Sequence, residues 1–324
     1  MVPDTLTVVG VTLEVGAIAV VSWYLKRHWK VINDEAFAVA SEAAVPARAE
    51  RKKERRRGKE KDKERAGAGA AVAAEPMSLA AAAALGRPAA PAWDWHPLVA
   101  MVVVAVSLTL QQYFGHHETY EATFRAFRSS EYYPLGSFAW WSGWRVVGYV
   151  VMPIIAIVAM RERIRDYGVA LKGQLKHLWI YAVLYLVVLP GVIFASFTAP
   201  FQHTYPFYKC AGRSAFDFIS WEILYAAQFV SLEFFFRGYI LQSLRRTMGA
   251  YAIFVMIVPY CMIHYGKPLL ETTGAIVAGL VLGTLALRTG SIWCGALIHI
   301  TVAITMDVLA LVHTGWRSWP RCGM

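Results

Sequence analysis

The chain has 324 residues, of which 57% are hydrophobic and 17% charged, and its formal net charge is +10. A mean hydropathy of +0.42, with fewer charges than the roughly 25% of soluble domains, excludes an ordinary soluble protein. The positive charge does not indicate a nucleic-acid partner, because residues 51–65 alone hold ten Lys/Arg against four Asp/Glu. The composition therefore predicts an all-α protein whose helices lie mostly in a bilayer.

Eight apolar stretches are long enough to cross a hydrocarbon core of about 30 Å, which takes about 20 helical residues. In chain order they lie at 6–25, 97–114, 135–160, 178–197, 215–244, 250–265, 269–287 and 290–313. The first stretch lacks a preceding basic region and a following cleavage site, so we expect a retained span and not a signal peptide. The pattern predicts a polytopic helix bundle with about eight transmembrane helices.

These stretches divide the chain into five parts. They are a first transmembrane helix at 1–25, a basic and Ala-rich disordered cytoplasmic linker at 26–96, helices two to four with their loops at 97–214, a core of helices five to eight at 215–313, and a C-terminal tail at 314–324. Basic residues beside the span ends place the linker in the cytoplasm and both termini outside. The linker is expected to attract anionic lipid. The four cysteines show no disulfide or zinc spacing and are predicted to be packing residues.

Nine ionisable residues lie inside the predicted spans, where each costs a few kcal/mol and normally marks a site or an internal ion pair. They are Glu14, Arg145, Asp217, Glu222, Glu233, Arg237, His264, His299 and Asp307. Four of the nine fall in the predicted span 215–244, which makes this helix the first place to look for a site.

Helical geometry predicts which of these residues meet. Glu233 and Arg237 are one turn apart on one face of a helix. The chain turns near Gly249, and Glu233 and His264 each lie about fifteen residues, or about 23 Å, from this turn. An antiparallel hairpin therefore brings a carboxylate and an imidazole to one depth on neighbouring helices, with His299 somewhat lower on the last span.

Several functions fit this set of residues. A carboxylate beside imidazoles is typical of proton transfer and oxyanion stabilisation. Glu233, His264 and His299 are also a ligand set for a divalent metal such as zinc, although no HExxH helix is present. Alternatively, Glu233 and Arg237 form an internal ion pair of a structural bundle, or Glu222 and Glu233 are the proton sites of a transporter.

Three short motifs in this region resemble a known family. The chain reads SLEFFFRG at 231–238, YCMIH at 260–264 and RTGSIW at 288–293, and it then reaches His299. This pattern resembles the CPBP family, the CAAX protease and bacteriocin-processing (Abi) intramembrane endopeptidases, whose motifs are EExxxR, FxxxH and HxxxN/D in successive helices. The resemblance covers about residues 215–310.

The resemblance implies a role for each matching residue. Glu233 matches the second Glu of the first motif and Arg237 its Arg, while His264 and His299 match the two motif histidines. Glu233 would act as general base on a water molecule, both histidines would position the water or stabilise the oxyanion, and Arg237 would hold Glu233. The resemblance implies no certain cofactor and leaves a divalent metal as an alternative.

Two positions depart from the family pattern. The leading Glu is Leu232, and the Asn/Asp four residues after His299 is Ala303, with Asp307 the nearest acidic residue. The resemblance implies an intramembrane endopeptidase that cleaves membrane-anchored protein substrates in maturation or sorting, in a bacterial inner membrane. The departures keep open a catalytically inactive CPBP-like membrane partner or immunity protein.

Overall fold

The computed structural model describes residues 5–63, 94–171, 178–316 and 322, with side chains for all of these except 38–63. Every regular element in this part of the chain is helical. The chain divides into two compact units, Met1–Phe37 with His96–Met324, and Ala38–Trp95. The site lies in the first unit.

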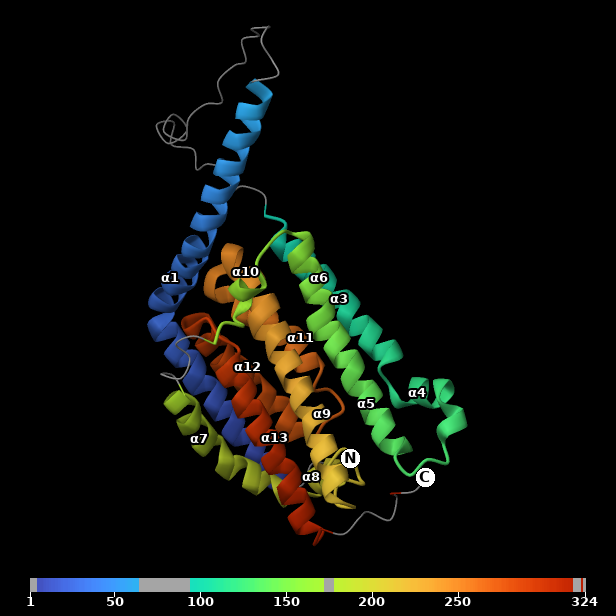
Figure 1. Cartoon of the computed structure of the whole chain (residues 1–324). Coiled ribbons are helices and arrows are strands. Elements are labelled where there is room, and N and C mark those ends of the chain that lie inside the picture. Colours follow the sequence, from blue (N-terminus) through green and yellow to red (C-terminus); the bar gives the residue numbers. More distant parts are fainter. Residues whose placement is uncertain (1–4, 64–93, 172–177, 317–321, 323–324) are drawn as a thin grey trace. The chain divides into compact units, whose positions relative to one another are not determined.

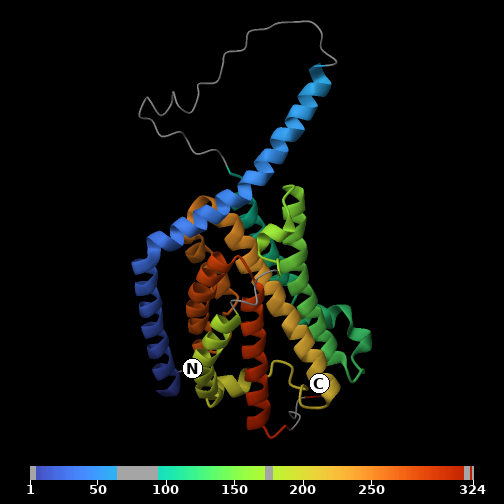
Figure 2. The same cartoon turned by 60° about the vertical axis from the view of Figure 1, so that its left-hand side comes forward.

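The helices of the chain are shown in Figures 1 and 2. In chain order they are α1 (Thr5–Lys63), α3 (His96–Phe114), α4 (His117–Thr123), α5 (Tyr133–Val146), α6 (Met152–Ala159), α7 (Leu178–Ser196), α8 (Ala199–Thr204), α9 (Ala215–Glu233), α10 (Leu241–Met248), α11 (Ala252–Met262), α12 (Leu269–Thr289) and α13 (Trp293–His313). Two π-helices, η2 (Val147–Val151) and η5 (Phe234–Ile240), join α5 to α6 and α9 to α10.

Six of the described helices are long and apolar enough to cross a membrane. They are Thr5–Phe37, His96–Phe114, Tyr133–Ala159, Leu178–Ser196, Leu269–Thr289 and Trp293–His313. The prediction of an all-α, multi-pass membrane protein is therefore confirmed, whereas the predicted number of eight spans is not reached. The stretch 215–244 is helical but carries four charged residues, and α11 has 11 residues, about 17 Å of helix.

The first helix is much longer than the sequence predicts. The stretch 1–25 was expected to end where a disordered linker begins, but α1 continues to Lys63. Glu, Lys, Arg and Ala are strong helix formers, so this polar segment favours helix without burying an apolar face. Residues 64–93 of the predicted linker lie outside the described part of the chain.

A continuous helix of α9, η5 and α10 carries the first motif. It starts at Ser214, whose hydroxyl caps the helix by accepting from the backbone N–H of Asp217 at 3.1 Å, and such caps stabilise a first turn. Figures 1 and 2 show α9 between α5 and α13, and it packs against both. The charged face of this helix is thus enclosed by neighbouring helices.

The turn after α10 sits at Gly249, which has a φ of +55°. A Cβ at this position would lie 2.4 Å from Oδ1 of Asn33, the same atom that accepts the backbone N–H of Ala250 at 3.0 Å. Glycine is needed here both for the positive φ and for the close approach of α1. This turn starts the hairpin that the sequence predicts between the first two motifs.

One prediction about the cysteines is wrong. Cys210 and Cys322 form a disulfide across 112 residues, whereas Cys261 and Cys294 are free. The pairing links the loop before α9 to the C-terminal end of the chain. Sequence spacing contains no signal for it, because the two sulfurs meet only through the tertiary fold.

Candidate active site

The four predicted site residues come from the ends and middles of different elements. Glu233 is the last residue of α9, Arg237 lies in η5, His264 follows α11, and His299 lies in α13. The π-helical stretch that carries Arg237 is a rare geometry, found frequently at functional sites. All four lie in the first unit of the chain.

Glu233 contacts two basic side chains through one oxygen. Nη1 of Arg237 and Nδ1 of His299 each lie 3.0 Å from Oε1 of Glu233. The side chains of Glu233 and Arg237 are 1% and 0% exposed, while that of His299 is 16% exposed. The arginine supplies the opposite charge that a buried carboxylate requires, and the histidine connects the pair to the accessible surface.

These contacts leave hydrogen-bonding capacity unused. Oε1 of Glu233, the three guanidinium nitrogens of Arg237 and Nδ1 of His299 are buried and have no hydrogen-bond partner among the described residues. The short distances are ion-pair contacts whose angles do not meet hydrogen-bond geometry. Buried polar groups are nearly always hydrogen-bonded, and exceptions are common where a ligand or reactant binds.

A glycine lies directly against the buried carboxylate. A Cβ at Gly295 of α13 would be 2.4 Å from Oε2 of Glu233, which is much closer than any real Cβ contact. The absence of a side chain at this position lets α13 approach α9. Sequence analysis missed Gly295, because one glycine in an apolar helix carries no signal of what lies opposite.

Tyr260 joins the two motif histidines to the arginine. Its ring lies under the Arg237 guanidinium at 4.1 Å, its hydroxyl lies 3.3 Å from Nε2 of His299, and its ring contacts His264 edge-on at 4.8 Å. Tyrosine replaces the Phe of the second motif, and it adds a hydroxyl that reaches His299. The three motifs therefore meet around one aromatic ring.

His264 has a defined tautomer in this arrangement. Its Nδ1 lies 2.8 Å from the carbonyl oxygen of Tyr260, which only accepts, so Nδ1 carries the proton and Nε2 holds a lone pair. The backbone carbonyl of His264 accepts from the hydroxyl of Thr272 at 2.9 Å. This second bond ties the turn after α11 to the start of α12.

The positions that depart from the motif have other roles in the fold. Leu232 packs against the main hydrophobic core, and Ala303 is buried in a second core cluster with Trp221. Asp307 accepts from Nε1 of Trp221 at 2.6 Å. The nearest acidic residue of the third motif thus pairs with α9 at Trp221 and makes no hydrogen bond or ion pair with Glu233, Arg237 or His299 within the described chain.

The other ionisable residues of the predicted spans lie outside this group. Glu14 hydrogen-bonds to Thr273, Asp217 pairs with Arg213 at 2.6 Å, and Glu222 has one buried oxygen without a partner. The structure therefore gathers Glu233, Arg237 and His299 in direct contact and His264 beside them through the Tyr260 ring.

A metal site is not evident in this arrangement. Among the residues described, no group of three or more His, Cys, Asp or Glu side chains is arranged to hold a metal ion. A metal ion would need the Glu233 carboxylate as a ligand, but the Arg237 guanidinium already contacts this carboxylate at Oε1. The donor set therefore does not fit a metal ion.

A second cluster of similar composition lies at the far end of α10. Glu162, which follows α6, accepts from His96 at 2.8 Å, from Arg246 and from Tyr167. Burial disfavours the ionised carboxylate, but the hydrogen bonds from His96, Arg246 and Tyr167 outweigh it and lower the pKa of Glu162 to about 2. This cluster fastens the loop after α6 to α3 and α10.

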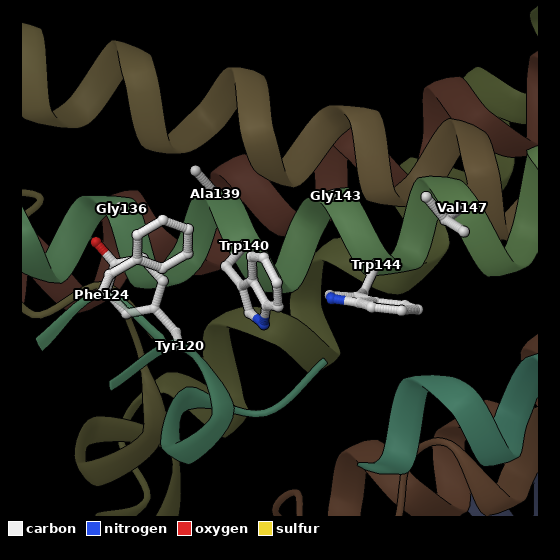
Figure 3. A pocket seen from close by; sticks show the side chains of 8 residues that line it. All are labelled: Tyr120, Phe124, Gly136, Ala139, Trp140, Gly143, Trp144 and Val147. Atoms are coloured by element: carbon white, nitrogen blue, oxygen red, sulfur yellow. The ribbon is translucent and has the colours of Figure 1, made fainter. Parts of the chain in front are cut away.

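An apolar pocket lies apart from both clusters. It is lined by the residues labelled in Figure 3, which are Tyr120, Phe124, Gly136, Ala139, Trp140, Gly143, Trp144 and Val147. These residues belong to α4, α5 and their neighbours, and none of them is a predicted site residue. The candidate site is thus a buried polar cluster, separate from this pocket.

The fold and the cluster define a class of protein. It is a multi-pass helical membrane protein in which a buried Glu–Arg pair contacts one histidine of α13, with a second histidine, from the turn after α11, beside them. Residues 213–305 match the model of a family described as "Type II CAAX prenyl endopeptidase Rce1-like". The match covers the segment that holds all four site residues, and it supports the resemblance to the CAAX protease (CPBP) family that the motifs indicate. Searches of curated proteins and of solved structures found no match.

Proposed function

We propose that this protein is an intramembrane endopeptidase that hydrolyses peptide bonds of membrane-anchored protein substrates. The observation that carries the proposal is the convergence of Glu233, Arg237 and His299 at 3.0 Å contacts inside an apolar helix bundle. Ionisable groups are costly in such a place and are usually functional. The family match over 213–305 supports the reaction type.

In the proposed mechanism, Glu233 is the general base. It takes a proton from a water molecule as the water oxygen attacks the peptide carbonyl carbon, and the same proton later passes to the leaving amine. The charge of Arg237 keeps Glu233 ionised and oriented between turnovers. His264 positions the water by accepting a hydrogen bond at Nε2, and His299 positions the water or donates to the oxyanion of the tetrahedral intermediate.

A non-catalytic membrane partner or immunity protein is the alternative. It is favoured by Leu232, which removes the leading carboxylate of the motif, and by the ion pair that engages the remaining one. In that case the Glu–Arg pair would only hold α9, η5 and α13 together. The two proposals differ in whether the cluster turns over a substrate.

Substrate access is proposed from the non-cytoplasmic side. Basic residues gather at the Arg245–Arg246 end of α10 and after α6, and such residues remain in the cytoplasm. The disulfide Cys210–Cys322 joins the segment before α9 to the segment after α13, at the opposite end of these helices from Arg245 and Arg246. Disulfides persist in oxidising compartments. Both features support one orientation, which favours substrates processed on the outer side of a bacterial cell membrane over prenylated cytosolic ones. Contact of the basic segment 51–65 with anionic lipid remains part of this proposal.

The test is cleavage of membrane-anchored reporter peptides by the purified full-length protein in nanodiscs. Glu233→Gln should lower the rate by about 10²–10⁴-fold. His264→Ala should do so as well while keeping the Glu233–Arg237 pair, which separates catalysis from folding. Glu222→Gln, a matched carboxylate change on the same helix, should cleave like the wild type. Equal rates for all four proteins would refute the assignment, and absence of any cleavage would favour the non-catalytic partner.

A further inference from the structure

Arg145 is an ionisable residue of a membrane span that the proposed mechanism does not use. It lies near the end of α5, inside the apolar helix Tyr133–Ala159. Its Nη1 donates to Oε1 of Gln111 at 2.8 Å and to the hydroxyl of Tyr149 at 2.6 Å. Its guanidinium also lies over the rings of Trp141 and Tyr149, at 5.6 and 5.5 Å.

These contacts leave its positive charge without an opposite charge. No carboxylate of the described chain lies within ion-pair distance of Arg145, in contrast to Arg213, Arg237 and Arg246, which each have at least one. Neutral partners and aromatic faces offset only part of the cost of a cation in an apolar span. The remaining partner that such a site favours is an anion.

The guanidinium also has donors to spare. Nε and Nη2 of Arg145 carry three N–H groups, and these groups make no hydrogen bond within the described residues. The two nitrogens are also absent from the set of fully buried polar atoms that have no partner. They therefore face accessible space. Gln111 is 6% exposed, and its Oε1 holds the guanidinium by accepting from Nη1. The site thus offers the planar pair of donors on Nε and Nη2, held in place by a buried amide.

Helix packing places Arg145 level with the catalytic carboxylate. Gln228 of α9 donates to Ser142 of α5 at 2.8 Å, and the rings of Tyr149 and Phe235 lie 4.7 Å apart. Arg145 lies between Ser142 and Tyr149 along the chain, so it lies level with the turn of α9 that ends at Glu233. An anion at this depth lies well inside the span.

Aromatic contacts connect this position to the catalytic histidines. Arg145 donates to the hydroxyl of Tyr149, and the ring of Tyr149 lies 5.9 Å from that of Phe236. Phe236 in turn lies 5.2 Å from Tyr260, the residue around which the motifs meet. A chain of packed aromatic rings therefore links the Tyr149 partner of Arg145 to the group around Tyr260.

We propose that Arg145 binds a carboxylate of the substrate and so sets which peptides are cleaved. The inference rests on the proposed function. A carboxylate matches the flat fork of a guanidinium with two parallel bonds, and a membrane-anchored peptide brings one either at its C-terminus or on an Asp or Glu side chain. A lipid phosphate is disfavoured because headgroups lie outside the hydrocarbon core.

The experiment uses three N-acylated apolar peptides of one sequence, which carry a free C-terminal carboxylate, a C-terminal amide, or an amide with one internal Asp. Binding and cleavage are measured on the full-length protein in zwitterionic nanodiscs. A charge-assisted bond of this kind is worth about 10- to 100-fold. The wild type should prefer the carboxylate peptides over the plain amide by this factor. Preference for the free acid indicates recognition of the C-terminal carboxylate, and preference for the Asp peptide indicates recognition of a side-chain carboxylate.

The variants decide whether Arg145 is responsible. Arg145→Gln should abolish the preference by raising KM for the carboxylate peptides while kcat changes little, and Arg145→Lys should restore part of it. Arg125→Gln, which removes an exposed positive charge near α4, should keep the preference. Thermal unfolding confirms that each variant is folded.

The binding and cleavage measurements test the carboxylate site and the protease assignment separately. A selective, Arg145-dependent binding without cleavage would refute the protease assignment and keep the carboxylate site. Equal binding of acid and amide by the wild type would overturn the carboxylate site even if cleavage is observed. Stabilisation by phosphatidylglycerol that depends on Arg145, without peptide selectivity, would overturn it in favour of a lipid site.

Discussion

Two clusters of the same residue types occupy the two ends of the segment from Glu233 to Arg246, and they differ in how completely their hydrogen bonds are made. Each combines a Glu, an Arg, a His and a Tyr. At Glu162, every partner donates directly to the carboxylate. At Glu233, the contacts are as short as 3.0 Å, but Oε1 of Glu233, the guanidinium nitrogens of Arg237 and Nδ1 of His299 have no hydrogen-bond partner among the described residues.

The difference separates a structural role from a chemical one. A satisfied network holds three segments together and has little capacity left for a substrate. An unsatisfied one in an apolar interior is costly, and the cost is accepted where reactants supply the missing bonds. The same composition therefore predicts fastening at Glu162 and catalysis at Glu233.

The strongest test of this contrast replaces each glutamate by glutamine. Glu233→Gln should reduce kcat for a membrane-anchored reporter peptide by about 10²–10⁴-fold, because the general base is lost. Glu162→Gln should leave kcat close to the wild-type value. The rates are measured on protein that elutes as a single folded species. A larger loss for Glu162→Gln than for Glu233→Gln would reverse the two roles.

Gly295→Ala should have the next largest effect on activity. The added Cβ would meet Oε2 of Glu233 at 2.4 Å, so the carboxylate must move, and a shift of about 1 Å in a catalytic group costs up to about 100-fold. We expect kcat to fall by about 10- to 100-fold. Gly191→Ala in α7, where a Cβ meets nothing within 4 Å, is the matched control and should keep full activity.

These two predictions also show what the sequence could and could not provide. Glu233, Arg237, His264 and His299 were predictable because ionisable residues in apolar spans are rare and their helical spacing sets their depth. Gly295 was not, because its importance depends on which residue faces it across two helices. The direct contact of His299 with Glu233 was not predictable in this way, because counting residues from the start of the last span places His299 lower than Glu233.

The fold was predictable in kind and less so in detail. Apolar length predicts membrane helices well, and six of the eight expected spans meet the criterion. The helix from Ala215 to Met248 does not, because the charges that mark the site also lower its hydropathy. The remaining span, α11, has only 11 residues. The disulfide Cys210–Cys322 had no local signal at all.

Disruption of the Glu162 cluster should lower the free energy of unfolding and leave activity unchanged. Glu162→Gln removes a carboxylate that holds Arg246, and partly buried pairs of this kind contribute about 1–3 kcal/mol. We expect a lower free energy of unfolding in detergent, measured by denaturant titration. Glu118→Gln, at a side chain that is 88% exposed, should leave stability unchanged. An unchanged stability of Glu162→Gln would mean that the hydrogen bonds do not fasten the loop.

The smallest expected effect is a dependence of stability on pH. The pKa of Glu162 is lowered from 4.5 to about 2 in the folded protein. A carboxylate with a lowered folded pKa stabilises the fold fully above its unfolded pKa, and this contribution is lost as pH falls toward the folded pKa. The stabilisation should therefore be complete above about pH 5 and decline between about pH 4.5 and 2.

This window can be isolated by comparing two proteins. The melting temperature of the wild type should exceed that of Glu162→Gln near neutral pH, and the difference should shrink as pH is lowered through the window. Other carboxylates titrate in both proteins, so their effect cancels in the difference. A difference that stays constant from pH 6 to below pH 3 would mean that Glu162 is not held as an ionised acceptor. The contrast between a fastening cluster and a catalytic one would then lose its electrostatic basis.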